Sequence, residues 1–156
     1  MAKTLNDLLD TAIQDEIAAQ KFYLEAREKT NNAKLKDFFN TLANEEKGHE
    51  RLLKGVKEME LYDGSLQVDD DALKQIEGAH QIPDLVPMDD MTIEWAMEIA
   101  MIKENKAAQV YAQLAETSPQ EEIMKLFTSI ASDERRHLKM IDEHYKIHTG
   151  QMGWEA

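Results

Sequence analysis

The sequence contains no cysteine among its 156 residues. This absence excludes disulfide bonds, thiolate nucleophiles, iron–sulfur clusters and cysteine-ligated zinc. A metal ion bound by these residues would have to be held by carboxylates, imidazoles and water, and such ligands suit iron, manganese or zinc.

Glycine and proline, which most often interrupt regular structure, are also scarce, with six and three copies. Apolar residues instead recur every three or four positions through most of the chain from Leu5 onward, and this spacing predicts long amphipathic helices. The length suits a single domain with a substantial core, which we place at residues 1–156. The expected helices span about residues 5–30, 33–62, 91–117 and 119–148.

Three short segments predict where these helices begin and end. The turn TNN (30–32) offers an N-cap for the second helix, and DG (63–64) is typical of a C-terminal stop. The segment SPQE (118–121) has the pattern of a capping box, with serine at the N-cap, proline at N1 and glutamate at N3. We therefore expect the last helix to begin at Pro119.

Basic residues are few relative to acidic ones: 18 lysines and arginines stand against 31 aspartates and glutamates, which gives a formal net charge of −13. This balance argues against nucleic acid or an anionic membrane as a partner, because both require a basic surface. No apolar run approaches the roughly 18 residues of a membrane-spanning helix, and the first ten residues lack the apolar segment of a secretory signal. We therefore expect a cytoplasmic protein.

The connections between the predicted helices are short, long and short in turn. Short connections make consecutive helices antiparallel neighbours, and one long crossover between the second and third helices is the ferritin-like variant of the four-helix bundle. The crossover, residues 65–90, holds two of the three prolines, and we expect a short helix over residues 70–78 within it. We predict an all-α, ferritin-like four-helix bundle of two helix hairpins, with an elongated pair of open hairpins as the alternative.

The two predicted hairpins repeat each other at an offset of 88 residues. The segment EIAAQKFY (16–23) aligns with ENKAAQVY (104–111), and the same offset aligns EKGH (46–49) with ERRH (134–137) without a gap. Each hairpin therefore carries a lone glutamate on its first helix and a Glu-x-x-His pair on its second helix. The repeated candidate ligands are Glu16, Glu46 and His49 in the first hairpin and Glu104, Glu134 and His137 in the second.

The spacing of these residues indicates a shared site in the core. Residues three apart share one helix face, and each lone glutamate precedes its pair by 30 residues, enough for the chain to turn and return to the same level. Two hairpins packed about a pseudo-twofold axis would bring together four carboxylates and two imidazoles, which is the ligand pattern of di-iron bundles. Buried carboxylates are costly without cations, so we expect two metal ions to stabilise the fold. The alternative is an old duplication whose polar face survived without a metal.

A third Glu-x-x-His spacing occurs at Glu77 and His80, in the crossover. It has no counterpart at the offset of 88, so we interpret this spacing as a coincidence. The predicted ligand set excludes both residues.

The pairs E…EKGH and E…ERRH, carried by four helices over roughly residues 5–148, resemble the rubrerythrin-like branch of the ferritin-like di-iron proteins. The resemblance implies a non-haem di-iron oxidoreductase that reduces peroxide or dioxygen in defence against oxidative stress. It implies two iron ions held by the four glutamates and two histidines above, although manganese or zinc would also suit these ligands. An iron-storage or metal-buffering protein with a ferroxidase site, and a structural bundle with a vestigial site, are the alternatives.

The resemblance also implies roles for individual residues. Glu46 and Glu134 would bridge the two ions, and His49 would be a terminal nitrogen ligand, as would its counterpart in the second hairpin. Tyr23 and Tyr111 would donate hydrogen bonds to ligands, with simple core packing as the alternative role.

Two expectations concern partners. Full-length rubrerythrins carry a cysteine-rich rubredoxin domain that supplies electrons, and the absence of cysteine here implies an external donor such as a rubredoxin-type protein. We also expect a homodimer. The crossover is long enough to permit two chains to exchange hairpins, which would build the same site from both.

Overall fold

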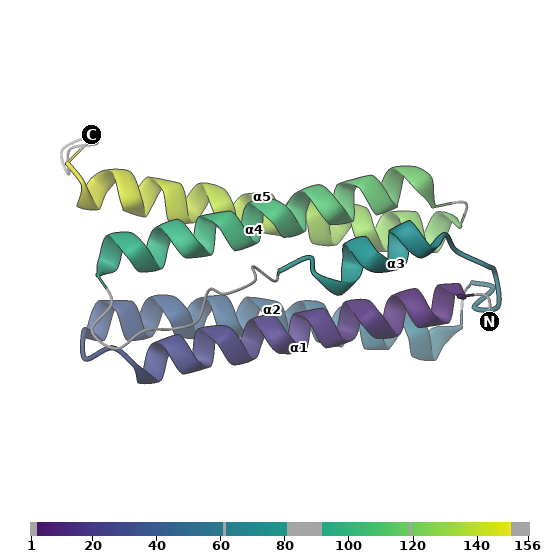
Figure 1. Cartoon of the computed structure of the whole chain (residues 1–156), viewed down its shortest axis with the longest axis horizontal. Helices are drawn as coiled ribbons and strands as arrows, with labels where there is room; N and C mark the ends of the chain where they lie inside the picture. The colour runs from purple at the N-terminus through teal and green to yellow at the C-terminus, as the bar shows by residue number, and fades with distance from the viewer. Residues whose placement is uncertain (1–2, 61, 81–91, 119, 151–156) are drawn as a thin grey trace.

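Four long helices form two antiparallel hairpins in the computed structural model of the chain (Figure 1). In the first hairpin α1 packs along α2, and in the second α4 packs along α5, while the short α3 packs against both α1 and α4. The structure describes residues 3–60, 62–80, 92–118 and 120–150. The helices are α1 (Leu5–Glu28), α2 (Ala33–Met59), α3 (Asp70–Glu77), α4 (Ile93–Thr117) and α5 (Glu121–His148).

This arrangement confirms the predicted all-α bundle of two hairpins joined by a long crossover, including its short helix. A core cluster that draws buried side chains from all five helices rules out open hairpins, because both hairpins contribute to it. The part of the crossover from residue 81 to residue 90, and the predicted start of the third long helix at Met91, lie outside the described residues. Within them, that helix begins after Thr92, whose side chain accepts a hydrogen bond from the backbone of Trp95.

Two predicted helix ends need correction. The helix α2 ends at Met59, before the predicted stop, because Glu60 already adopts a left-handed conformation with φ 52°. The capping box predicted at residues 118–121 is wrong: α5 begins at Glu121 and has no side-chain cap. The Ser118 hydroxyl is instead used locally, since it accepts a hydrogen bond from the backbone of Gln120 and donates one to the carbonyl of that residue. The predicted cap at residues 30–32 is confirmed by the hydrogen bonds that the side chain of its last residue, an asparagine, accepts.

The segment that follows α2 returns to the start of α1. The backbone N–H of Leu5 donates to the carbonyl of Leu66 at 2.8 Å, and that of Asn6 donates to the carbonyl of Gly64 at 3.1 Å. These bonds serve N–H groups that the first turn of a helix cannot satisfy itself. A side chain at Gly64 would overlap with Asn6, so the close approach of the two segments requires glycine at this position.

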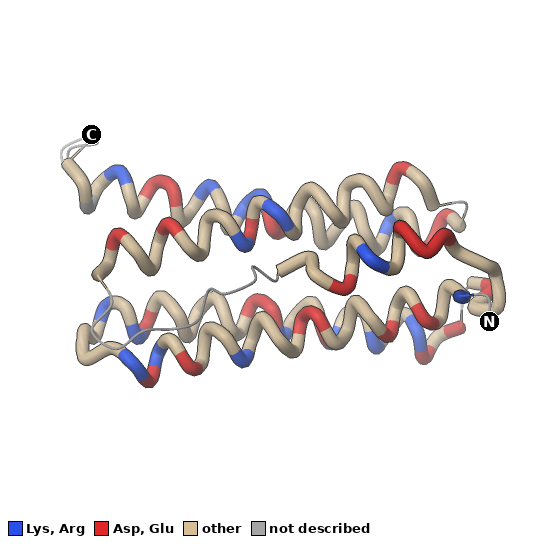
Figure 2. The backbone as a smooth tube through the Cα atoms, in the orientation of Figure 1, with Lys and Arg blue, Asp and Glu red and all other residues tan. Residues whose placement is uncertain are grey.

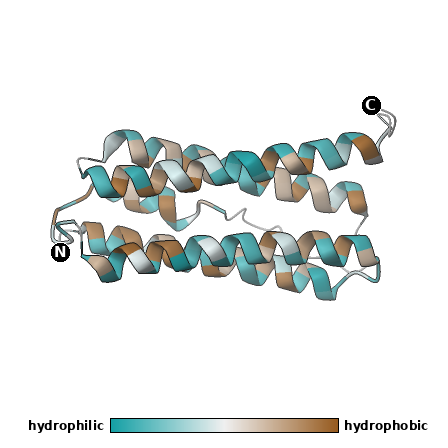
Figure 3. Ribbon diagram, turned by 180° about the vertical axis from the view of Figure 1, so that it is seen from behind, coloured by the Kyte–Doolittle hydropathy of each residue, from teal (hydrophilic) through white to brown (hydrophobic). Residues whose placement is uncertain are grey.

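Two groups of buried apolar side chains enclose a polar layer near the middle of the bundle. One group includes Leu9 and Phe127, and the other includes Phe39 and Ile141. Apolar and polar positions alternate along each helix, as seen from behind in Figure 3. The two apolar groups seal the polar layer from both ends, which sets the environment of any site built there.

Charged side chains lie mainly outside this core. Figure 2 shows acidic and basic positions interspersed along the helices of both hairpins. Among the described residues, no helix combines the length and the apolar character that crossing a membrane requires.

Candidate metal centre

The polar layer holds all six predicted ligands, and each of them is at most 2% exposed. They come from the four long helices, one residue each from α1 and α4 and one Glu-x-x-His pair each from α2 and α5. The layer forms because residues three apart share a helix face and because each hairpin returns to the level at which it started. The six are Glu16, Glu46, His49, Glu104, Glu134 and His137.

Two buried tyrosines cross-link the hairpins at this layer. The Tyr23 hydroxyl donates a hydrogen bond to Oε1 of Glu104 at 2.8 Å, and the Tyr111 hydroxyl donates to Oε1 of Glu16 at 2.8 Å. The two contacts are related by the offset of 88 residues, so the pseudo-twofold symmetry of the sequence is present in the hydrogen bonds. The tyrosines therefore contact predicted ligands and do not only fill the core.

The outer nitrogens of the two predicted ligand histidines also contact the opposite hairpin. Nε2 of His49 lies 3.3 Å from Oδ2 of Asp133, and Nε2 of His137 lies 2.9 Å from Oε2 of Glu45. Glu45 and Asp133 are equivalent at the offset of 88. A carboxylate that accepts the outer N–H of a histidine fixes the ring and leaves the other nitrogen free to bind a metal. In both histidines that other nitrogen, Nδ1, faces the glutamates of the layer.

Several buried polar atoms of the layer have no hydrogen-bond partner among the described residues. Buried polar groups in folded proteins nearly always have a partner, so an unpaired set in one place needs an explanation. Carboxylate oxygens and imidazole nitrogens are donors for iron, manganese and zinc, so bound cations would satisfy this set. The atoms are Oε2 of Glu16, both carboxylate oxygens of Glu46, Oε2 of Glu104 and of Glu134, and Nδ1 of His49 and of His137.

Six buried residues fall into two groups that each approach the size of one ion site, and the predicted ligand His49 belongs to neither group. Ligand atoms about 2.1 Å from an ion lie within about 4.2 Å of one another, and in each group one ligand atom from every residue lies within 4.8 Å of the others. Glu46 and Glu134 belong to both groups, so the two sites are adjacent. The first group adds Glu16 and His80, and the second adds Glu104 and His137.

The prediction that excluded His80 from the ligand set is wrong, because His80 lies in the layer. Its Nε2 lies 3.0 Å from Oε2 of Glu46 and 3.2 Å from Oε1 of Glu134, and the residue is fully buried. The Glu-x-x-His spacing itself is still a coincidence, because Glu77 is exposed. No local sequence signal identifies His80, because it lies in the turn after α3 and reaches the layer only through the packing of the crossover.

Without metal, burial and neighbouring charges make some residues of the layer retain protons. Burial and the neighbouring charge of Glu46 hold the pKa of Glu16 well above its usual range. Burial would also raise the pKa of Glu46 and Glu134, but the charge of His80 and hydrogen bonds from neighbouring residues together outweigh burial and lower both pKa values, that of Glu134 strongly. Burial would lower the pKa of His80, yet the carboxylates of Glu46 and Glu134 raise it well above its usual range. Metal ions that bind here must therefore displace protons.

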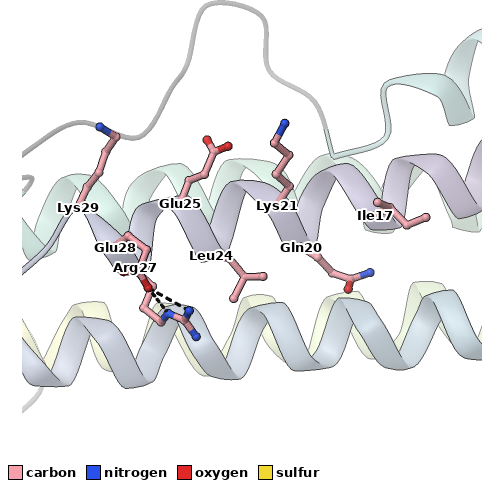
Figure 4. A pocket seen from close by; sticks show the side chains of 8 residues that line it. All are labelled: Ile17, Gln20, Lys21, Leu24, Glu25, Arg27, Glu28 and Lys29. Atoms are coloured by element: carbon pink, nitrogen blue, oxygen red, sulfur yellow. Dashed lines mark hydrogen bonds and ion pairs between the residues drawn. The ribbon is translucent and has the colours of Figure 1, made fainter.

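Two surface hollows differ in their relation to this layer. The hollow along the outside of α1, shown in Figure 4, runs from Ile17 to Lys29 and contains none of the predicted ligands. A second hollow between α2 and α5 is lined by Gly48, His49 and Asp133, among others. A small molecule in the second hollow would meet a predicted ligand, so this hollow adjoins the layer.

Comparisons with known proteins show the family and the fold of the chain. The sequence matches the Rubrerythrin family model over residues 7–145. Among solved structures, the chain is similar to a hypothetical protein from Pyrococcus furiosus, with a TM-score of 0.66, 27% identity, and coverage of 96% of this chain and 93% of that chain. It shares its fold with KatB, a manganese catalase from Anabaena PCC7120, with a TM-score of 0.63, 14% identity, and coverage of 96% and 75%. No curated protein gives a significant match.

Proposed function

Because this chain belongs to the rubrerythrin family, we propose that it is a di-iron oxidoreductase that reduces hydrogen peroxide or dioxygen. The observation that carries the proposal is the pair of buried donor groups that share Glu46 and Glu134. When bound, two ferrous ions would supply the two electrons needed to cleave the oxygen–oxygen bond of a peroxide. The physiological role would be defence against oxidative stress in the cytoplasm.

The residues of the layer divide naturally between two ions. Glu46 and Glu134 belong to both donor groups, so we assign them as the bridging ligands. The remaining predicted ligands are assigned one glutamate and one histidine to each ion. These are Glu16 and His49 on one side and Glu104 and His137 on the other.

The rest of the chain would prepare this site for redox chemistry. Hydrogen bonds from Tyr23 and Tyr111 hold two carboxylates in place, and the apolar groups above and below the layer exclude water. A fixed and dry set of donors is the protein's contribution to metal catalysis. The 156 residues offer no cysteine-based redox group, so we propose that a separate rubredoxin-type protein supplies electrons to a homodimer.

The same donors would also suit manganese or zinc, and iron storage with a ferroxidase site is the rival function. Manganese is named in the description of one protein that shares this fold. Storage requires a closed shell of many subunits, so the native mass separates the two functions: a dimer favours the redox enzyme.

The decisive experiment is an anaerobic titration of the metal-stripped protein with Fe(II), followed by a pulse of hydrogen peroxide and measurement of absorbance. The proposal predicts saturation at two ions per chain and rapid oxidation of both. Without saturable binding near two ions, the repeated glutamates and histidines would be structural, and the proposed function would be wrong.

A further inference from the structure

The polar layer contains a third histidine that the internal repeat does not provide. His80 lies in the turn that follows α3, at the end of the described part of the crossover. Its ring is fully buried, and its Nε2 lies 3.0 Å from a carboxylate oxygen of Glu46 and 3.2 Å from one of Glu134. These two glutamates are the residues shared by both donor groups, so the imidazole points at the centre of the layer.

Two buried charged residues hold His80 in this position. Asp15 accepts hydrogen bonds from the backbone N–H of His80 at 3.0 Å and contacts its Nδ1 through Oδ2 at 2.6 Å. The Nζ of Lys103 donates to the carbonyl oxygen of His80 at 2.8 Å and also lies 3.9 Å above the ring centroid of Phe22. Asp15 and Lys103 are only 3% and 2% exposed. The backbone and the ring of His80 are thus fixed from both hairpins.

The residues that hold His80 break the symmetry of the repeat. Asp15 and Lys103 are equivalent at the offset of 88, and each directly precedes a predicted ligand. Other equivalent positions at the layer carry the same type of group, as Glu45 and Asp133 do. Here the two positions carry opposite charges and contact different parts of one residue. His80, Asp15 and Lys103 together therefore make the layer asymmetric.

Resting on the proposed function, we propose that His80 is a seventh metal ligand, which binds through Nε2 only the ion held by Glu16. The donor group that contains His80 includes Glu16 and excludes Glu104. The contact of Nδ1 with Asp15 holds the ring with Nε2 toward the layer. Nε2 would present a lone pair to a metal ion that displaces its proton, as in carboxylate–histidine–metal arrangements.

This assignment makes the two ions unequal. The ion beside Glu16 receives two histidines and three carboxylates, whereas the ion beside Glu104 receives His137 and three carboxylates. An ion with fewer protein ligands keeps a position for a reacting molecule.

The proposal is tested by calorimetric titration of the metal-stripped full chain with Co(II). The variant is His80→Gln, and the matched control is His144→Gln, which makes the same change at an exposed histidine of α5. We expect two ions in the wild type and in the control. The His80→Gln variant should bind one ion as the wild type does and the other at least about tenfold more weakly.

Each other outcome has a distinct meaning. Wild-type affinity for both ions in His80→Gln would overturn the role of His80 and leave the proposed function intact. Failure of the wild type to bind Co(II) would overturn both. A wild type that binds one ion, with a second gained in His80→Gln, would show that His80 acts as a cation in place of a metal, and would overturn the proposal.

A second measurement counts the bound histidines directly. In the Co(II)-loaded wild type, each bound histidine should show its outer N–H as a paramagnetically shifted, solvent-exchangeable proton resonance. Three such resonances are expected, from His49, His80 and His137. Three in the wild type and two in His80→Gln would support the proposal, and retention of all three in a folded His80→Gln variant would overturn it.

Discussion

The hydroxyl group of Tyr23 in α1 donates a hydrogen bond to Glu104 in α4, in the opposite hairpin, at 2.8 Å. The equivalent tyrosine of α4 returns the same contact to α1 at the same distance. Both bonds are buried, so water cannot replace the donor if it is removed. The two hairpins are therefore joined at the level of the proposed metal centre by reciprocal polar contacts as well as by apolar packing.

Replacing either tyrosine by phenylalanine should destabilise the metal-free protein. Tyr23→Phe and Tyr111→Phe should each lower the free energy of unfolding by about 1–3 kcal/mol, because a buried carboxylate oxygen loses its donor. Urea unfolding followed by circular dichroism measures this. The control is Tyr145→Phe, which removes an exposed bond to Glu98 and should change stability by less than about 0.5 kcal/mol. An equal loss in the control would mean that burial does not explain the effect.

Loss of a shared glutamate should reduce the number of bound ions. Glu46→Ala and Glu134→Ala each remove a member of both donor groups, so each variant should lose at least one of two ions. Glu77→Ala removes an exposed glutamate and should still bind two. Metal analysis after gel filtration of folded protein measures the stoichiometry. Equal loss in Glu77→Ala would contradict the argument from the repeat.

The carboxylates that contact Nε2 of His49 and of His137 should affect the binding of different ions. Asp133→Asn should weaken binding of the ion held by His49 about tenfold, and Glu45→Gln should weaken binding of the ion held by His137 similarly, because each replaces the charged acceptor of an outer N–H by a neutral amide. Co(II) affinities of the two single variants and the double variant measure this. If both single variants weakened binding of the same ion, the assignment of each carboxylate to a histidine of the opposite hairpin would be wrong. Asp142→Asn, which removes an ion pair elsewhere on α5, should leave both affinities unchanged.

The pH dependence of stability should reverse sign when metal binds. Burial would lower the pKa values of the three histidines in the layer, but neighbouring carboxylates raise them, so in the metal-free protein the folded state holds protons that the unfolded chain releases. This stabilisation is fully present below about pH 6.5, the unfolded value, and is lost as the pH rises through the folded values. Bound ions replace these protons, so the loaded protein should become more stable over the same range.

The expected slope for the stripped protein is a fall of at least about 1.4 kcal/mol in unfolding free energy per pH unit between about pH 7 and pH 8. The window stops there because burial lowers the pKa of Lys103 to about 8, and this group adds stability as the pH rises further. Urea unfolding at both pH values, in chelator and in excess Co(II), measures the two slopes. Slopes of the same sign in both forms would contradict the prediction.

The sequence predicts the helices and the convergence of six polar residues because both depend on patterns that the sequence itself contains. Helical periodicity is local, and the repeat shows that the two hairpins present the same residues at the same level. His80 could not be identified in this way, because its position depends on how the crossover folds back onto α1 and α4. That packing involves contacts such as the one between His80 and Asp15, which are distant in sequence and have no counterpart in the other hairpin.

The helix ends show a different limit. The residue that ends α2 in a left-handed conformation is Glu60, where sequence rules favour glycine or asparagine. Ser118 has the sequence context of an N-cap, but it closes the turn between α4 and α5 through its own neighbour Gln120. In both cases the sequence rule names a favoured helix end, and the chain places the end a few residues away from it.

A bundle built from two nearly equivalent hairpins has two ways to be assembled, since the repeated glutamates, histidines and tyrosines would still meet if the hairpins exchanged places. The contacts of Asp15 and Lys103 with His80 distinguish the two assemblies. In the observed arrangement Asp15 contacts the imidazole of His80, and Lys103 donates a hydrogen bond to the carbonyl oxygen of His80. The exchanged arrangement would bury both charges without these partners. The same three residues that we propose to make the two ions unequal would thereby also favour a single native topology.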